Sequence, residues 1–519
     1  MSATSTNNDT VTAVGFRSQR GPVLIALMLS SALVAIDSTI IATAVPSIVQ
    51  DLGGFSQFPW LFSSYLLAQA VSVPIYGKLS DLYGRRPLMF FGIGVFLLGS
   101  VMCGVAWSMP VLIAARVVQG LGAGAIQPIA MTIAGDIYTV AERARVQGYL
   151  ASVWAISAVV GPTLGGVFSE FVSWRWIFFV NLPVGALATW MLLRAFSENV
   201  TRRAHTIDFA GAGTLTVGCS LLILGLLEGG VAWAWTSPMS LALFVVGIGL
   251  LIAFVFIERR AVEPILPLWV FSRRILAGTS LVSLLVGGLV VGLTSYVPTY
   301  VQSVLGFGPL VAGFALATLT IGWPLAAAVA GRIYLRIGFR DTALIGAAIA
   351  LLGTFLVTLL DEQSSVFTVA GYCFVLGIGM GLIASPLLVA AQSVVGWDQR
   401  GVVTGTNMFA RSAGSAVGVA VFGAIANTRL ALKFDHPPTG VNGSIPKDAD
   451  AASAAVRSGS TASAAVQSFV RGALTDATHH VFLGAFVAAA IMAALTLLVP
   501  RHTREFVPDD SDASATTTA

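Results

Sequence analysis

The sequence is poor in charged residues, histidine and cysteine. Only 10% of its 519 residues are Asp, Glu, Lys or Arg, and 56% are hydrophobic; a typical soluble domain is about 25% charged. A chain of this composition is not soluble, disordered or collagen-like. Its three cysteines all lie in apolar runs, which argues against a disulfide framework or a zinc site. The composition therefore predicts an all-α polytopic membrane protein.

The sequence also lacks the patterns of common catalytic and cofactor sites. It has no glycine-rich phosphate loop ending in Lys-Ser or Lys-Thr, so ATP is not expected as the energy source. His, Cys and carboxylate residues do not cluster at metal-ligand spacing. The basic residues are dispersed and the net charge is only +4, which argues against a nucleic-acid surface. We expect no enzymatic activity, no metal, no cofactor and no nucleic-acid partner.

Fourteen apolar runs are long enough to cross a membrane. A helix needs about 20 apolar residues to span a hydrocarbon layer of about 30 Å, and its backbone groups must pair within the segment. The predicted spans are 22–46, 58–79, 88–107, 110–133, 146–169, 174–195, 208–229, 238–257, 275–301, 309–335, 342–360, 366–391, 402–427 and 479–499. The first twenty residues lack a small-residue cleavage site, so the first run is expected to remain in the protein.

The basic residues predict the orientation. With the N-terminus inside, the inner loops and tails hold twenty Lys and Arg residues, and the short outer loops hold only Arg175. This asymmetry follows the positive-inside rule and favours an even number of spans. We expect a multi-pass protein of the cell (inner, cytoplasmic) membrane with both termini in the cytoplasm.

An internal echo divides the chain. Gly77–Arg86 follows the second run and Gly331–Arg340 follows the tenth, and both segments have glycines seven apart with Arg at the tenth place. A second echo, at an offset of 257 residues, relates Gly148, Gly161 and Gly166 to Gly405, Gly418 and Gly423. Duplicated six-helix halves facing a midplane site are typical of transporters.

The predicted organisation follows from the runs and the echo. It consists of an N-terminal cytoplasmic tail 1–21, a six-helix half 22–195, two inserted helices with linkers 196–274, a second six-helix half 275–499 and a cytoplasmic tail 500–519. Within the second half, the Ala/Ser/Gly-rich segment 428–478 predicts a flexible outer loop with a helical stretch over 463–476. This loop is a candidate docking site for an envelope partner or a lipidic substrate. Nothing in the sequence demands more than a monomer.

Two charges lie inside predicted spans and become candidates for ion coupling. Asp37 is in the middle of the first span, and Arg116 is in the fourth. Burial raises the pKa of a carboxyl group and a nearby cation lowers it, so such a pair can be tuned to bind and release a proton. The alternative interpretation is a permanent structural ion pair between Asp37 and Arg116.

Two glycine-containing motifs are candidates for conformational roles. In the segment Gly77, Asp81, Gly84, Arg85 and Arg86, the glycines allow a tight turn, and Asp81 can bond to arginines or to a helix N-terminus. Such contacts form in one state and break in the other, although a simple topology anchor is the alternative. In the fifth span, Gly161, Pro162, Gly165 and Gly166 predict close packing and a bend, or an ordinary contact between small residues.

These residues together resemble the major facilitator superfamily, in its fourteen-helix drug:proton antiporter branch. The resemblance covers residues 35 to about 425. It rests on Asp37-Ser38-Thr39, Gly77–Arg86, the Arg116–Gly122 segment, the Gly161–Gly166 segment, Trp174–Gly185 and Gly405-Thr406-Asn407 with Arg411. It implies the major facilitator fold and proton-driven export of lipophilic, often cationic compounds, with Asp37 and Arg116 in the coupling path. The second half has no acid clearly in mid-span, which argues against export of multivalent cations.

We therefore expect a proton-coupled antiporter of lipophilic compounds or drugs that works by alternating access in a lipid bilayer and confers antibiotic resistance. The proton gradient is its energy source. The candidate substrate-cavity residues are polar or aromatic groups on predicted spans: Tyr65, Gln119, Trp154, Tyr296, Gln302, Asn407 and Arg411. Two alternatives stay open, namely an exporter of an endogenous lipid or secondary metabolite and a non-transporting membrane receptor on the same fold.

Overall fold

The computed structural model describes residues 14–53, 57, 60–198, 208–229, 233–434 and 464–501. Within these ranges the regular structure is helical, apart from one isolated bridge between Gly229 and Trp233. The N-terminal helices are α1 (Gly21–Leu52), α2 (Trp60–Tyr83), α3 (Arg85–Gly104), α4 (Met109–Ile137), α5 (Val140–Phe171), α6 (Trp176–Phe179) and α7 (Asn181–Ala195). The others are α8 (Phe209–Glu228), α9 (Pro238–Glu258), α10 (Trp269–Ser272), α11 (Arg274–Ser303), α12 (Pro309–Ile337), α13 (Phe339–Thr358), α14 (Val366–Ser393), η2 (Trp397–Gln399), α15 (Arg400–Phe434) and α17 (Ala464–Thr496).

Thirteen spans in the described part of the chain are long and apolar enough to cross a membrane. They match thirteen of the fourteen predicted runs, and α6 and α7 together form one of them. The remaining run is α2, a helix of 24 residues that is long enough to span but more polar, since it carries Lys78 and Asp81. The predicted all-α polytopic architecture is confirmed.

The last two long helices differ from the predicted boundaries. Helix α15 continues to Phe434 and α17 begins at Ala464, so both ends of the predicted loop 428–478 are helical. The start of α17 is rich in alanine, the residue with the highest helix propensity, which allows the helix to continue beyond the apolar run. The helical stretch predicted over 463–476 is therefore part of α17. The rest of the loop and the two chain ends, 1–13 and 502–519, lie outside the described residues.

The sixth predicted span, 174–195, is interrupted near its start. Helix α6 ends at Phe179 and α7 begins at Asn181, with Pro183 in the first turn of α7. A proline there has no N–H to donate to the preceding turn, which favours a new helix start. Arg175, just before α6, bonds to Asp51 of α1 at 2.6 Å, so this corner is fixed to the end of the first helix.

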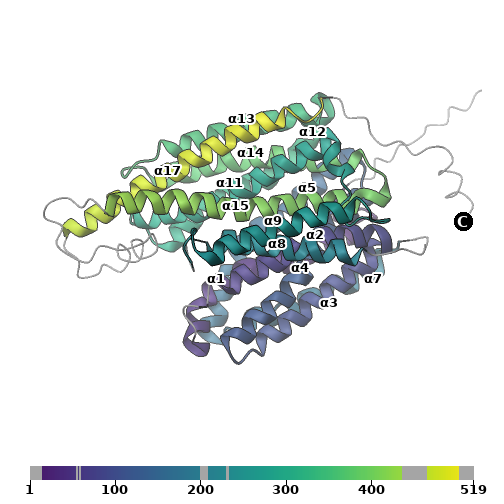
Figure 1. Cartoon of the computed structure of the whole chain (residues 1–519), viewed down its shortest axis with the longest axis horizontal. Helices are drawn as coiled ribbons and strands as arrows, with labels where there is room; N and C mark the ends of the chain where they lie inside the picture. Colours follow the sequence, from purple (N-terminus) through teal and green to yellow (C-terminus); the bar gives the residue numbers. More distant parts are fainter. Residues whose placement is uncertain are drawn as a thin grey trace, which may run out of the picture.

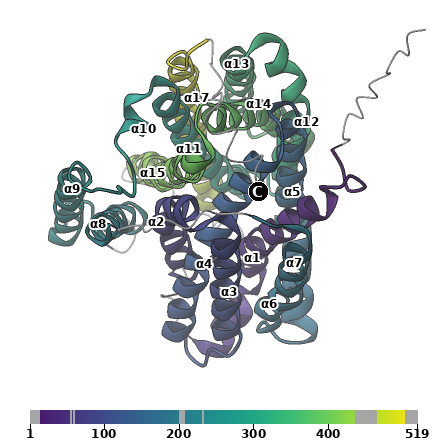
Figure 2. The ribbon, with the colours of Figure 1, turned by 90° about the vertical axis from the view of Figure 1, so that its right-hand side faces the viewer.

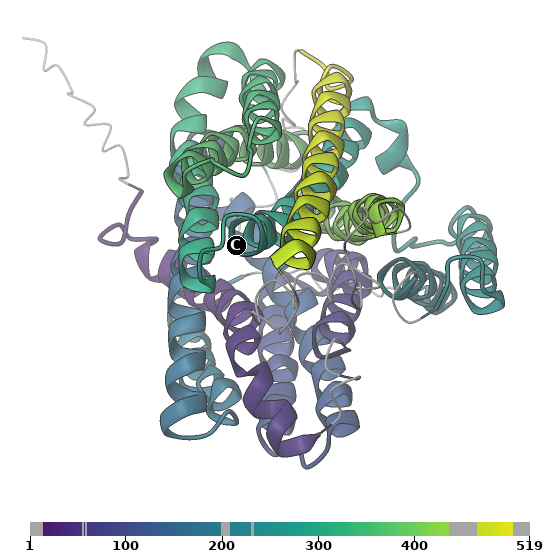
Figure 3. The same cartoon turned by 90° about the vertical axis from the view of Figure 1, so that its left-hand side faces the viewer.

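The buried apolar side chains form separate clusters for the two parts of the chain. Two clusters consist of residues from α1 to α7 and the segments that flank them, which we call the N-terminal half. The largest cluster consists of residues from α10 to α17, with Ala144 of α5 as its one buried member from outside. We call α11 to α17 the C-terminal half. Figures 2 and 3 show these two groups side by side.

Helices α8 and α9 form a pair at the edge of the bundle (Figure 2). They pack closely through Gly218 and Gly247, where an added Cβ would contact the opposite helix. A fourth apolar cluster connects this pair to the rest of the protein through Ala70 of α2 and Ala416 of α15. Helix α8 therefore touches both halves.

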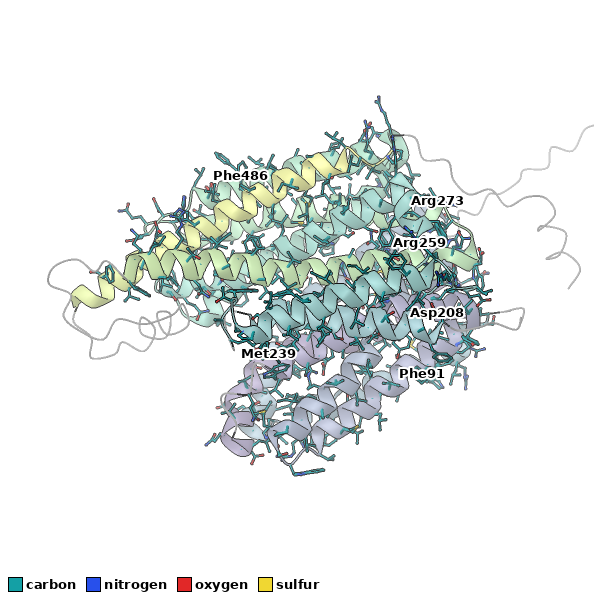
Figure 4. All side chains as sticks on the ribbon, in the orientation of Figure 1. Phe91, Asp208, Met239, Arg259, Arg273 and Phe486 are labelled. Atoms are coloured by element: carbon teal, nitrogen blue, oxygen red, sulfur yellow. The ribbon has the colours of Figure 1, made fainter. Side chains whose placement is uncertain are left out.

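One end of the bundle carries the start of α1 and the end of α17 (Figure 1). There Arg20 pairs with Glu142 at the start of α5, and Arg501 pairs with Asp341 at the start of α13. Arg259 also lies at this end, whereas Met239 lies toward the opposite end (Figure 4). We call it the terminal end.

The two echoed glycine motifs have the same backbone geometry at the terminal end. Gly84 separates α2 from α3 with φ 93° and ψ 157°, and Gly338 separates α12 from α13 with φ 90° and ψ 164°. A positive φ strains any residue with a Cβ, so both turns require glycine. Gly84 thus turns the chain between α2 and α3, as the Gly77–Arg86 motif suggested, and Gly338 makes the same turn between α12 and α13.

Candidate functional site

Asp37 is fully buried in the middle of α1 and accepts three hydrogen bonds. Its Oδ2 accepts from Nη1 of Arg116 at 2.6 Å. Its Oδ1 accepts from Nε2 of Gln119 at 2.8 Å and from Nδ2 of Asn181 at 3.2 Å. Helices α1, α4 and α7 therefore meet around one carboxylate. Three hydrogen-bond donors, one of them the Arg116 guanidinium group, therefore surround this carboxyl group.

Arg116 is also fully buried, but Asp37 is not its only partner. Nη1 donates to Oε1 of Gln119 at 2.6 Å, and Nε donates to the carbonyl oxygen of Leu61 at 3.1 Å. The guanidinium carbon lies 4.0 Å from the centre of the Tyr65 ring, an arrangement typical of a cation–π contact. Arg116 would keep these contacts if the carboxyl group of Asp37 became neutral.

A second layer of polar groups surrounds this pair. Ser100 of α3 accepts from Gln119 at 2.8 Å and from Asn181 at 3.2 Å. Tyr65 of α2 lies against the same site, and its buried hydroxyl has no hydrogen-bond partner among the residues that the structure describes. The sequence reasoning missed Asn181 and Ser100. Their signal was a lone amide and a lone hydroxyl in otherwise apolar spans, which many structural residues share.

The geometry of the Asp37 site limits what it can do in this conformation. Asp37, Arg116 and Gln119 are at most 1% exposed, so the carboxyl group does not reach water here. The arrangement agrees with the ion pair that both sequence interpretations expected. Exchange of a proton requires a second conformation in which Asp37 is hydrated.

The glycines of the α5 motif pack against α1 just beyond Asp37. A Cβ on Gly161 would overlap the Thr39 side chain, and a Cβ on Gly165 would overlap Ile40 and Thr43. Thr39 Oγ1 also donates to the carbonyl oxygen of Ser157 on α5 at 2.9 Å. Both interpretations of the motif expected a close helix contact, and the structure places Gly161 and Gly165 in one.

The other two members of this motif have different surroundings. Gly166 has open space where a side chain would be. Pro162 lies inside α5 and is half-buried. The α1–α5 contact therefore depends on Gly161 and Gly165.

Further toward the terminal end, α5 packs against α12 of the C-terminal half. A Cβ on Gly148 would lie 2.8 Å from Cβ of Ala328, and one on Gly331 would overlap Ala144. The Tyr334 hydroxyl donates to the carbonyl oxygen of Val140 at the start of α5. We call this the α5–α12 contact. Helix α5 thus touches the Asp37 helix along one part and the C-terminal half along another.

The equivalent junction on the other side of the bundle joins α2 to α15. A Cβ on Gly77 would lie 2.6 Å from the carbonyl oxygen of Gly401. Asp81 accepts from the backbone N–H groups of Gly401 and Val402, both at 2.8 Å, and so caps the N-terminus of α15. The helix dipole and the unpaired N–H groups there favour a carboxylate. We call this the α2–α15 contact.

Arg85 joins the α2–α15 contact to two further residues. Its Nη2 donates to Asp81 at 2.8 Å and to the carbonyl oxygen of Trp397, and its Nε donates to Asp136 at 2.9 Å. The Arg85 guanidinium lies 3.7 Å from the centre of the Trp397 ring. Arg400 completes the set with a bond to Asp136 at 3.0 Å.

Asp81 and Arg85 were predicted as switch residues, and the structure places both between the halves. The sequence reasoning missed Asp136, Trp397 and Arg400. Arg400 was counted only as one of the inner basic residues. Arg86 lies apart from this network, where its backbone N–H donates to Glu198 at 2.8 Å.

The remaining candidate cavity residues are dispersed. Trp154 packs against the N-terminal apolar cluster, and Tyr296 packs against the C-terminal one. Gln302 is half-buried near the end of α11. Asn407 of α15 accepts from Ser283 at 3.0 Å and donates to Thr279 at 3.2 Å, both on α11. Arg411, one turn further along α15, is half-buried.

In the described part of the chain, no three His, Cys, Asp or Glu side chains come close enough to hold a metal ion.

Comparison with known proteins points to one family. The Major Facilitator Superfamily profile matches residues 27–419. The chain is 36% identical to "Multidrug resistance protein 3" of Bacillus subtilis over 81% of this chain and 82% of that protein. It is 34% identical to "Multidrug transporter protein MdtP" of the same organism, over 80% and 77%. It is 32% identical to "Efflux pump dotC" of Dothistroma septosporum, over 76% and 70%.

Solved structures agree on the architecture. The proton:xylose symporter XylE, a major facilitator protein, has a TM-score of 0.60 at 12% identity and covers 92% of this chain and 95% of its own. The human organic anion transporter MFSD10 has a TM-score of 0.59 at 15% identity, with 91% and 99% covered. At such identities the likeness shows the fold alone.

Proposed function

The chain belongs to the major facilitator superfamily, and we propose that it is a proton-coupled exporter of lipophilic compounds that works by alternating access. Its family consists of transport proteins, which are generally not enzymes, and its relatives include proteins named as multidrug transporters and efflux pumps. We further propose that it belongs to the fourteen-helix drug:proton antiporter branch. The fourteen long helical elements support this assignment.

One observation carries the coupling: an ionised pair lies in the middle of a membrane-spanning bundle, where charge is expensive. Burying a charge at this depth costs about 2.5–3.5 kcal/mol or more, so an acid there needs a function or a permanent partner. Asp37 has three donors, while Arg116 has two acceptors besides Asp37. A proton on Asp37 would therefore release the carboxyl group without leaving Arg116 unpaired.

Helix α5 connects the site of Asp37 protonation to the contact between the two halves. It packs on α1 through Gly161 and Gly165 and on α12 through Ala144 and Gly148. Movement of α1 after protonation of Asp37 would be transmitted to α5 and then to the α5–α12 contact. Both contacts between the halves named above lie toward the terminal end, which supports assigning this conformation to a state closed at that end.

We place the terminal end on the cytoplasmic side of the cell (inner, cytoplasmic) membrane, following the distribution of basic residues. In this arrangement protons enter from outside to Asp37, and the substrate leaves to the outside. The proton gradient supplies the energy, no cofactor takes part, and export of antibiotics would confer resistance. A monomer is sufficient for this cycle.

The test uses the purified full-length chain in proteoliposomes, with ethidium as the transported probe. D37N should abolish accumulation of ethidium driven by a pH gradient, because its side chain cannot bind and release a proton. The same variant should keep exchange of ethidium across the membrane without a gradient, which shows that it is folded and binds the probe. Full gradient-driven accumulation by D37N would refute the coupling assignment.

The matched control is D51N on the same helix. Asp51 lies fourteen residues beyond Asp37, and its side chain is 48% exposed and paired with Arg175. The exposed pair is expected to contribute less than about 1 kcal/mol, and D51N should transport like the unmodified protein. Equal loss in both variants would indicate general damage to α1 rather than loss of coupling.

A further inference from the structure

Arg411 is a charged residue in the interior of a spanning helix that the coupling mechanism does not use. It is the twelfth residue of α15, which has 35 residues. Within the described part of the chain, no hydrogen bond or ion pair involves its guanidinium group; only its carbonyl oxygen accepts a bond, from Ser415. The side chain is half-buried and keeps some accessible surface. A guanidinium group without a counter-charge at this depth calls for a partner from outside the protein.

The neighbouring residues place Arg411 on the inner face of α15. Thr404, seven residues earlier, accepts a hydrogen bond from Gln392 of α14 at 2.9 Å. Gln392 also donates to the carbonyl oxygen of Met131 on α4, in the opposite half. Seven residues are two helical turns, so Arg411 lies on the face of Thr404 and about 10 Å further from the terminal end. Val417, which is exposed, points about 120° away.

The acids of the C-terminal half are far from Arg411 along the chain and lie at helix ends or in connections. The described ones are Asp341, Asp361, Glu362, Asp398 and Asp476. None of these lies on α15. The nearest acid before Arg411 in the sequence is Asp398 of η2, thirteen residues earlier. In the Asp37 site, the buried carboxylate of Asp37 and the buried guanidinium group of Arg116 already pair with each other.

The backbone around Arg411 is fixed. An added Cβ on Gly287 of α11 would overlap the Arg411 carbonyl oxygen, so the two helices are in backbone contact there. Ser415 donates to the carbonyl oxygens of Gly287 and Arg411, both at 3.2 Å. Asn407 and Ser283, one turn closer to the terminal end, bond to each other. A rigid support of this kind orients the guanidinium group with little loss of entropy on binding.

We propose that Arg411 binds the oxyanion head group of an amphiphilic substrate, a carboxylate or a phosphate attached to an apolar body. This assignment rests on the proposed export function and names the substrate class. A guanidinium group forms two parallel hydrogen bonds with either oxyanion, and these bonds are stronger where water is scarce. The apolar body of the substrate would lie between the two halves, on the side of the α2–α15 and α5–α12 contacts that faces away from the terminal end.

The experiment measures binding and transport with four probes that share one dansyl-labelled dodecyl chain. The probes end in a carboxylate, a phosphate monoester, a neutral methylamide or a trimethylammonium group. The full-length chain is reconstituted in phosphatidylcholine membranes, so that no anionic lipid competes. The carboxylate or phosphate probe should bind about 10- to 100-fold more tightly than the methylamide, the range expected for hydrogen bonds between charged groups.

Three variants identify the residue. R411Q should abolish the preference for the anionic probes, and R411K should keep part of it because a lysine retains the charge. R429Q removes an exposed arginine on the same helix and should behave like the unmodified protein. The trimethylammonium probe should bind to R411Q as well as, or better than, to the unmodified protein. A preference for carboxylate over phosphate, or the reverse, identifies which oxyanion the site accepts.

Each outcome decides for or against the site. Equal binding of the anionic and neutral probes to the unmodified protein would overturn the proposal, as would an anion preference that R411Q leaves unchanged. If R411Q does not fold, the unmodified protein and R411K still give the comparison between anionic and neutral probes. If a pH gradient drives transport of ethidium but the protein shows no preference for the anionic probes, the Arg411 proposal is contradicted and the proposed export function stands. Anion preference without gradient-driven transport of any probe contradicts the proposed coupling and leaves the site in place.

Discussion

The α2–α15 and α5–α12 contacts use the same motif in different ways. In both, a motif glycine brings two helices from opposite halves together, Gly77 in one and Gly331 in the other. In both, a glycine seven residues later turns the chain with a positive φ. The α2–α15 contact adds a network of buried ion pairs, whereas the α5–α12 contact has apolar packing and a tyrosine hydroxyl.

The start of the second helix in each contact explains the difference. Helix α5 is capped within its own half, since Thr139 and Glu142 form a capping box. Helix α15 takes its cap from the other half, because Asp81 accepts from the N–H groups of Gly401 and Val402. If the halves separate as the proposed alternating access requires, α5 keeps its cap and α15 loses it. Separation of the halves therefore leaves backbone N–H groups of α15 without their cap at the α2–α15 contact, whereas no cap is lost at the α5–α12 contact.

The largest effect is expected from D81N, which removes the charge that Arg85 and the α15 N-terminus share. Breaking a buried ion pair costs about 3–5 kcal/mol, so the variant should open at the terminal end. Spin labels on Y83C and D398C, with the three buried native cysteines left in place or replaced by serine, would report a longer and broader distance.

The control for this prediction is D341N. Asp341 lies at the same end but pairs with Arg340 and Arg501 within one half, and its side chain is 25% exposed. D341N should leave the distance unchanged. A D81N distance equal to that of the unmodified protein would mean that the α15 cap does not hold the halves together.

A smaller effect is expected from R400Q. Arg400 bonds to Asp136 and to the carbonyl oxygen of Gly135, and its side chain is 19% exposed. Losing a charged hydrogen bond there costs about 1.5–3 kcal/mol, while Asp136 keeps Arg85 as a partner. The same labels should show a partial shift toward the D81N distribution, and R400K should restore most of it. A shift larger than that of D81N would contradict the expectation that Asp81 contributes more than Arg400 to holding the halves together.

The glycine at the α5–α12 contact allows a rescue experiment. G331A should lower stability by about 1–3 kcal/mol, because its methyl group overlaps that of Ala144. Adding A144G removes the overlapping atom, so the double variant should recover most of the loss in thermal unfolding. G77A has no such rescue, because the atom it meets is the carbonyl oxygen of Gly401. Failure of A144G to improve G331A would contradict the described packing.

The smallest effect is expected from Y334F, which removes the hydroxyl that donates to Val140. One neutral hydrogen bond contributes about 0.5–1.5 kcal/mol, so the unfolding temperature should fall slightly and transport should continue. The apolar packing of the Tyr334 ring against Phe339, at 4.8 Å between ring centres, is kept. An effect on transport as large as that of D81N would show that the two contacts do not differ in the way described.

The sequence was most informative where chemistry is local. Long apolar runs predict spans, and the two positive-φ turns follow from glycine spacing within ten residues. Asp37 and Arg116 could be paired from sequence because charges are rare in mid-span. Asn181 also bonds to Asp37 but comes 144 residues later. It lies in the Trp174–Gly185 segment that resembles the family, but the resemblance of the segment did not indicate that Asn181 contacts Asp37.

The contacts between the halves were less predictable, because they depend on how distant helix ends meet. Asp81 could be expected to cap some helix, but its partners lie 320 and 321 residues away. Trp397 and Arg400 carry no local sign of a role, since a tryptophan or arginine at a span end is common. Their function follows only from the packing of α2 against α15.

The contacts of helix α8 with both halves matter for how the pair α8 and α9 can move. It contacts α2 through Leu215, Cys219 and Ile223 in a cluster that also includes Ala416 of α15. In the proposed alternating-access cycle, α8 would have to slide against either α2 or α15, because these two helices belong to different halves. Helices α8 and α9 would then shift relative to one of the two halves in each transport cycle.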